Sequence, residues 1–238
     1  MEAGIRATSP ERIRILASNY DCGDQAYIDG LAAMADSRKR GWWEQYRGNL
    51  PQGLLDVAEL EWFATRLRTL QTVHVPGLLQ LSGYARAIFD SALPPLPKSE
   101  IELRVAQRMQ RQQVLERETP VEYVAYVHEW ALHMQFGGRR TTREQLQYLC
   151  EMSEQENIDV RVLTVDVGAF PGAGHAVLYA NGAVPQLDTV QLDSAHGGEF
   201  THAEAQLSKY RAHMDWWHAK SLDPKASQDL IHSIARQL

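Results

Sequence analysis

Four polar residues that are able to bind a charged group lie along one predicted long helix, residues 99–118. Arg108 and Gln112 fall within the apolar face of this helix, and Arg104 and Arg111 lie at its edge. The apolar face itself consists of Ile101, Val105, Met109 and Leu115. Guanidinium groups directed toward a protein interior are rare unless paired, so these need a carboxylate or a bound anion.

Glu129, which follows the strand predicted for residues 121–127, is the carboxylate that we expect to pair with these arginines. One interpretation is a buried ion pair that ties the helix to the strand. The other is a pocket lined by arginine and glutamine that binds an anionic or polar ligand. In that case the aromatic side chains of Tyr84 and Trp130 are candidates to complete the site.

Metal and cofactor motifs are weak in this sequence. His128 and His133 are five residues apart, which places their rings about 140° apart on a helix, whereas a metalloprotease needs a spacing of four. His196, Glu199 and His202 form a possible metal set, but a Gly-Gly pair interrupts it and zinc is not expected. The glycine-rich loop 168–174 lacks the Gly-Lys-Ser/Thr ending of a phosphate loop. We therefore expect no metal and no cofactor, and assign no catalytic residues.

The elements that must position these residues are mostly helices. Apolar spacing and capping residues predict helices over 10–19, 24–35, 54–71, 82–93, 99–118 and 141–155, then one after the Thr201–Glu204 capping box and one from Pro224 to the C-terminus. Strands are predicted at 121–127, 158–165, 175–180 and 189–192. The order predicts an α+β fold, rich in helix, with a small sheet of about four strands flanked by helices.

Composition and charge set limits on the function. The net charge is −6, and all of it lies in residues 151–238. Nucleic-acid binders usually carry a basic patch, so direct DNA binding by these residues is not expected. No apolar run is long enough to span a membrane, and the two cysteines form no disulfide framework. The expected location is the cytoplasm, without a membrane partner.

Several segments together resemble one family. Residues 1–20, with Ser9-Pro10 opening a helix, look like the end of a helix-turn-helix domain. Further matching segments are Leu60-Glu61, the Val-Pro-Gly-Leu-Leu-Gln run at 75–80, Tyr-Ala-Arg-Ala at 84–87, and the arginine-rich run 104–112. In this order they resemble actinobacterial Xre-type helix-turn-helix regulators with a large C-terminal domain of unknown function, often described as antitoxin-like.

The resemblance implies three regions. Residues 1–36 would be the remnant, the last two helices, of an all-α DNA-binding domain, residues 37–53 a linker, and residues 54–238 a C-terminal α+β domain that senses a ligand or binds a partner. DNA contacts would come only from residues upstream of Met1, and a homodimer is expected. The partner would be a small-molecule effector or a small cognate protein. The sequence departs from the family pattern after Val165, where it reads Gly-Ala-Phe-Pro-Gly.

Two alternatives to a ligand-sensing regulator stay open at this point. One is a regulator-derived scaffold that acts as a small-molecule enzyme, a cyclase or isomerase in natural-product biosynthesis, using Arg108, Gln112, Glu129 and an aromatic side chain. The other is an antitoxin-like protein whose acidic C-terminal region binds a small basic partner.

Overall fold

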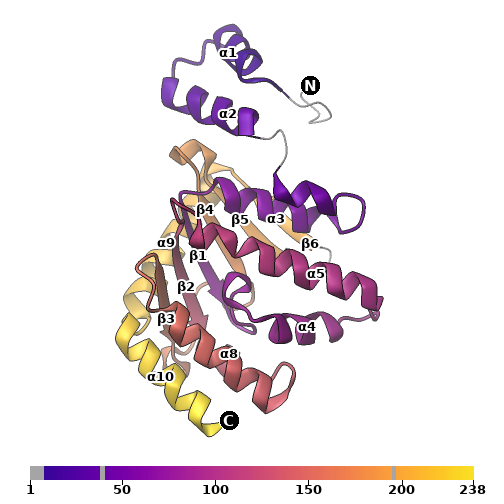
Figure 1. Cartoon of the computed structure of the whole chain (residues 1–238). Coiled ribbons are helices and arrows are strands. Elements are labelled where there is room, and N and C mark those ends of the chain that lie inside the picture. Colours follow the sequence, from indigo (N-terminus) through magenta and orange to yellow (C-terminus); the bar gives the residue numbers. More distant parts are fainter. Residues whose placement is uncertain (1–7, 38–40, 195–196) are drawn as a thin grey trace.

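A mixed six-stranded sheet organises the chain in the computed structural model, which describes residues 8–37, 41–194 and 197–238 (Figure 1). The strand order is β3-β2-β1-β4-β5-β6. The strands are β1 Arg66–Gln71, β2 Glu122–His128, β3 Ile158–Leu163, β4 Val177–Asn181, β5 Thr189–Ser194 and β6 Gly197–Thr201. Strands β1, β2 and β3 are parallel, and β4, β5 and β6 add to β1 in antiparallel fashion. The α+β class is confirmed, and the sheet is larger than the four strands expected.

Both faces of the sheet are covered, which explains why β2 is buried along nearly its whole length. On one face, α3 (Gln52–Phe63), α8 (Gly138–Met152) and α10 (Pro224–Gln237) pack against side chains such as Leu67 and Val160. On the other face, α9 (Glu204–Lys220) packs Trp217 against Leu70 and Tyr126. The result is a sheet held between two layers of helices.

The parallel strands are joined by helical segments. Between β1 and β2 the chain forms η3 (Gly77–Leu79), α4 (Ser82–Asp90), α5 (Lys98–Arg111) and α6 (Gln113–Glu116). Between β2 and β3 it forms α7 (Glu129–His133) and α8. In Figure 1, α3, α5 and α4 lie one after another in front of the sheet.

Two N-terminal helices, α1 (Pro10–Asn19) and α2 (Gln25–Ser37), form a pair at one end of the molecule (Figure 1). Ser9 caps α1 by accepting a hydrogen bond from the Arg12 amide, as its position before Pro10 predicted. The pair contacts the short helix η5 (Pro185–Leu187), where the Gln186 side chain donates to Asp24 at 2.8 Å. Further along the chain, η2 (Trp42–Tyr46) packs its aromatic side chains against α3.

The helix predicted over 54–71 is wrong in its second half. Helix α3 ends at Phe63, Ala64 is extended, and residues 66–71 form β1. Leu67 and Leu70 are three apart, which suits a helix, but they point to opposite faces of a sheet that is buried on both sides. The missed strand β6 begins with two glycines, which give no strand signal.

Other boundaries also differ from the sequence prediction. The helix predicted over 99–118 is two helices, because α5 ends at Arg111 and α6 begins at Gln113. Helix α8 begins at Gly138, three residues before the predicted start at Thr141. The predicted Thr201–Glu204 capping box does not form, because Thr201 ends β6, three residues before the start of α9. Asp223 does cap α10, accepting from the Ala226 amide at 2.9 Å.

None of the helices in the described part of the chain is both long and apolar enough to cross a membrane.

Candidate functional site

A cavity of about 250 Å³ lies between one face of the sheet and the helices α3 and α5. Its floor comes from four strands: Thr69 and Gln71 of β1, Tyr123 of β2, Leu178 of β4, and Gln191 and Asp193 of β5. These residues share a face because side chains alternate along a strand. The helices and the segment around η3 add Leu54, Val57, Glu61, His74, Val75, Gly77, Leu78, Gln80, Ile88, Arg108 and Arg111.

An ion pair between Glu61 and Arg111 forms part of the helical wall. The Arg111 guanidinium donates from Nε and Nη2 to the two Glu61 carboxylate oxygens, at 2.8 and 2.6 Å. Both side chains are almost fully buried. Burial by itself would lower the pKa of Arg111, but the charge and hydrogen bonds of Glu61 outweigh it and raise that pKa. The carboxylate thus neutralises Arg111 and fixes α5 against α3.

Arg108 lies one turn before Arg111 and has no carboxylate partner within 4 Å among the described residues. Its Nη1 donates to the Gln80 side-chain oxygen at 2.8 Å, and the guanidinium packs over the Phe89 ring at 4.6 Å. Its Nε is buried and lacks a hydrogen-bond acceptor in the described structure. Burial, and next the charge of Arg111, lower the pKa of Arg108 to about 9. The charges of Asp193 and Glu61 oppose this lowering only in part. The guanidinium stays charged at neutral pH, so the cavity is lined by a cation that no described carboxylate pairs with directly and whose Nε donor has no described acceptor.

The segment 75–80 is held in place by hydrogen bonds from three glutamine side chains. Gln112 donates to the Gln80 carbonyl at 2.7 Å, and the Gln80 side chain donates to the Val75 carbonyl at 2.6 Å. Gln145 of α8 donates to the Leu79 carbonyl and accepts from the Leu81 amide, both at 2.7 Å. These contacts fix the backbone that presents Gln80 to Arg108.

Tyr84 holds the other end of this segment. Its hydroxyl oxygen accepts from the Val75 amide at 3.3 Å. Burial raises the pKa of Tyr84 to about 12, so the phenol remains neutral. Tyr84 therefore supports the cavity wall from outside the cavity itself.

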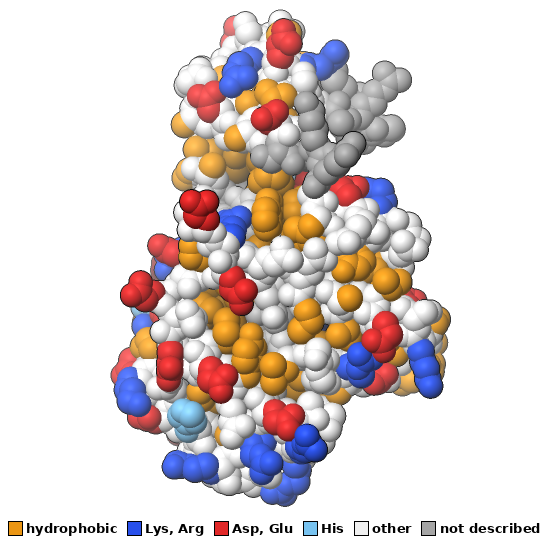
Figure 2. All heavy atoms as spheres, in the orientation of Figure 1, with side chains coloured by type: hydrophobic (Ala, Val, Ile, Leu, Met, Phe, Trp, Pro, Cys, Tyr) orange, Lys and Arg blue, Asp and Glu red, His pale blue; other side chains and the backbone are white. Residues whose placement is uncertain are grey.

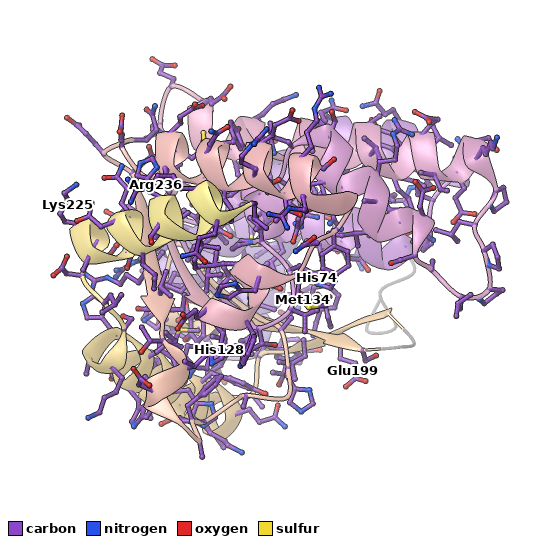
Figure 3. All side chains as sticks on the ribbon, turned by 90° about the horizontal axis from the view of Figure 1, so that it is seen from below. His74, His128, Met134, Glu199, Lys225 and Arg236 are labelled. Atoms are coloured by element: carbon purple, nitrogen blue, oxygen red, sulfur yellow. The ribbon has the colours of Figure 1, made fainter. Side chains whose placement is uncertain are left out.

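Two further polar residues line the cavity. His74 lies near the centre of the molecule when it is viewed from below (Figure 3), and its ring contacts the Phe136 ring in a tilted arrangement with centroids 4.9 Å apart. Burial, and next the Arg108 charge, lower the pKa of His74, so the imidazole is neutral at pH 7. Asp193 accepts from the Gln191 side chain at 2.6 Å. A neutral imidazole and a carboxylate thus line the same space as the Arg108 cation.

The structure places the seven site residues proposed from the sequence in different surroundings, and only some of them lie at the cavity. Arg108 and Arg111 line the cavity, whereas Gln112 and Tyr84 hold the segment beside it. Arg104 pairs with Glu100 at 2.6 Å on its own helix, outside the cavity lining. Glu129 accepts from the Val165 amide at 2.9 Å, and Trp130 on α7 is 60% exposed. The predicted pairing of Glu129 with the arginines is therefore wrong.

The partner that sequence reasoning missed is Glu61. It lies on α3 seven residues after Leu54 and four after Val57, on the apolar side of that helix. A carboxylate among apolar residues at helical spacing is the signal that could have identified Glu61, as it identified the arginines. The sequence also gives no signal for His74 in the loop after β1, Gln80 after η3, or Asp193 near the end of β5, because the order of strands that brings them together is not readable from a single sequence.

Metal-binding candidates give no site in the part of the chain that the structure describes. Within residues 8–37, 41–194 and 197–238, no group of three or more His, Cys, Asp and Glu side chains is arranged to hold a metal ion. His196, a member of the weak metal set in the sequence, lies outside the described residues.

Comparison with protein families matches residues 54–233 to "Domain of unknown function (DUF5753)". The chain belongs to the DUF5753 family. Every residue that lines the cavity falls within the DUF5753 match. Searches of curated proteins and of solved structures found no match to the chain.

Three of the segments that the sequence analysis singled out meet at the cavity of this DUF5753 domain. They supply Glu61, the run from Val75 to Gln80, and the arginines 108 and 111. The segments come from different elements, and the cavity is the place where they touch.

Proposed function

We propose that the DUF5753 domain of this chain binds a small anionic molecule in the cavity at Arg108, and that it serves as the sensing region of a transcriptional regulator. One observation carries the proposal: the Arg108 guanidinium lines the cavity without a carboxylate partner among the described residues, while Arg111 beside it forms two hydrogen bonds with the Glu61 carboxylate.

Electrostatics favours an anion as the ligand. A charge removed from water is costly unless an opposite charge or a full set of hydrogen bonds compensates it. Gln80 and the Phe89 ring compensate Arg108 only in part. A carboxylate or phosphate group would accept from the remaining donors, and charge-assisted hydrogen bonds of this kind are among the strongest.

The size and polarity of the cavity favour a small polar metabolite. Its volume of about 250 Å³ lies just below the range typical of pockets for drug-sized ligands. Thr69, Gln71, Gln191 and Asp193 offer hydrogen-bonding groups on the floor, opposite the apolar Leu54 and Val57. Asp193 in particular would pair with an amino group, so a ligand with both a carboxylate and an amine suits the site.

Helix α3 offers a route from the ligand to the N-terminal helices. Leu54, Val57 and Glu61 face the polar cavity, whereas Asp56, Leu60 and Phe63 line a second cleft beside α1 and α2. A small shift of α3 on ligand binding would therefore reach that pair. The regulatory role itself rests on the likeness of residues 1–20 to the end of a DNA-binding domain, of which residues 1–7 lie outside the described structure.

Isothermal titration calorimetry with a panel of small carboxylates, amino acids, phosphate and sulfate tests the binding proposal. At least one anion should bind the unaltered chain, and Arg108→Gln should weaken it by about 10- to 100-fold, as expected for loss of a charged hydrogen bond. Arg104→Gln is the matched control, since it removes an arginine of the same helix that lies outside the cavity. Equal losses in the two variants, or no binding by any anion, would overturn the proposal.

A further inference from the structure

His74 lines the same cavity as Arg108 and lies in the loop between β1 and η3. Its ring is partly buried and contacts the ring of Phe136. Burial, and next the Arg108 charge, lower the pKa of His74, while the Asp193 charge acts in the opposite direction. His74 thus responds to the charges that line this cavity, so a further charge placed there would change its protonation.

The other titratable side chains packed around this space keep one charge state near neutral pH. On α3 and α5, Glu61 and Arg111 form their ion pair, and Glu61 raises the pKa of Arg111 although burial opposes it. On β2 and α4, burial raises the pKa of the Tyr123 and Tyr84 phenols, that of Tyr84 to about 12. Among the described residues here, His74 is therefore the group suited to change its charge between about pH 5 and 8.

Binding of a simple anion would make the cavity negative. In the chain itself, the Arg108 cation and the Asp193 carboxylate have opposite charges, the Glu61–Arg111 pair is neutral, and the His74 ring is neutral at pH 7. One bound anion adds a negative charge to this balanced set. A negative charge at close range favours the charged form of an imidazole, by about 1–3 pKa units. A proton taken up by His74 would restore the balance.

We infer that His74 is a proton-linked binding residue of this site: it takes up a proton from solvent when a simple anion binds beside Arg108. The inference rests on the proposed anion site and names the residue that regulates it. The cavity should then hold such anions more tightly at lower pH. The gain in affinity is complete below the ligand-free pKa of His74, which lies under 6.5, and is lost as the pH rises through the higher pKa in the complex.

Calorimetric titration of the whole chain with sulfate and with formate, at several pH values from about 5.5 to 8, tests the inference. Neither anion titrates in this range, so a change in affinity reports on the protein. The affinity should fall by about 3- to 30-fold from the acid to the alkaline end. Titrations near pH 6 in two buffers of different ionisation enthalpy should show net proton uptake. In His74→Gln the affinity should not depend on pH, and the uptake should vanish.

The control must separate His74 from the other histidines, which reach the surface in places, as the pale-blue side chain in Figure 2 shows. His232 on α10 is exposed and lies outside the cavity lining. His232→Gln should keep the pH dependence of the unaltered chain. Proton NMR of the His74 ring in the unaltered chain needs no substitution, and its midpoint should move upward when the bound anion is at saturation.

Binding of either anion with an affinity that does not depend on pH, or with an unmoved His74 midpoint, would overturn the inference and leave the anion site in place. A pH dependence that persists in His74→Gln would overturn it in the same way. No binding of sulfate or formate at any pH would overturn it as well. The anion site itself would then require that another anion of the calorimetric panel binds.

Discussion

Arg111 and Glu61 are 50 residues apart in the sequence, and their side chains meet in a buried pair with two hydrogen bonds of 2.8 and 2.6 Å. Arg108 is one helical turn away, faces the same cavity, and pairs with no carboxylate among the described residues. The two arginines on this helix therefore differ in whether a carboxylate of the protein pairs with them. Arg111 has a structural role, whereas Arg108 is available to a ligand.

Glu61→Gln should destabilise the fold strongly, because it leaves the Arg111 charge buried without its partner. Removing one member of a buried ion pair typically costs about 3–5 kcal/mol in the free energy of unfolding. Urea denaturation followed by circular dichroism measures this change. The double variant Glu61→Leu with Arg111→Met should recover much of the loss. A cost below about 1 kcal/mol for the single variant would contradict a buried pair, since that is the range of exposed ones.

Arg108→Met should have the opposite effect in the absence of ligand. It removes a charge that Gln80 and the Phe89 ring compensate only in part, so the free energy of unfolding should stay constant or rise. Arg111→Met, three residues later, should lower it by leaving Glu61 unpaired. Thermal unfolding of the two variants side by side measures the contrast. Destabilisation of similar size in both would show that Arg108 is neutralised by the protein after all.

Gln145→Ala should loosen the segment 75–80. The Gln145 side chain makes two hydrogen bonds to this backbone, with the Leu79 carbonyl and the Leu81 amide. Leaving such buried groups without partners costs about 1–3 kcal/mol each. Hydrogen exchange of the Leu81 amide should become faster, whereas Gln147→Ala, an exposed glutamine on the same helix, should not change it. Unchanged exchange in Gln145→Ala would show that the Gln145 side chain does not hold this backbone in place.

His74 should titrate below its ordinary pKa of about 6.5 and make the fold sensitive to acid. Because the folded-state pKa is lowered, His74 contributes stability above pH 6.5, and that contribution is lost as the pH falls toward the folded-state value. Proton NMR of the His74 ring measures the midpoint. Arg108→Gln should raise the midpoint, since the Arg108 charge is the second cause of the shift after burial. A midpoint at or above 6.5 would contradict the buried, neutral imidazole.

The sequence predicted the helical elements and the inward arginines better than it predicted their partners. Helical spacing placed Arg108 on the apolar side of its helix, and the cavity confirms that placement. Glu129 was the predicted partner of the arginines because it follows the next strand along the chain. Which elements lie side by side is decided instead by the order of the strands in the sheet. The sequence prediction assigns residues 66–71 to a helix, so it lacks the central strand β1, which contributes Thr69 and Gln71 to the floor of the cavity.

An anomalous diffraction experiment on crystals soaked in bromide, an anion that scatters distinctively, tests the central claim most directly. The account predicts a bromide peak in contact with the Arg108 guanidinium in the cavity of the unaltered chain, and its absence in Arg108→Gln. Peaks on exposed lysines and arginines with none at Arg108, or a carboxylate of the same chain bound at that position, would contradict it.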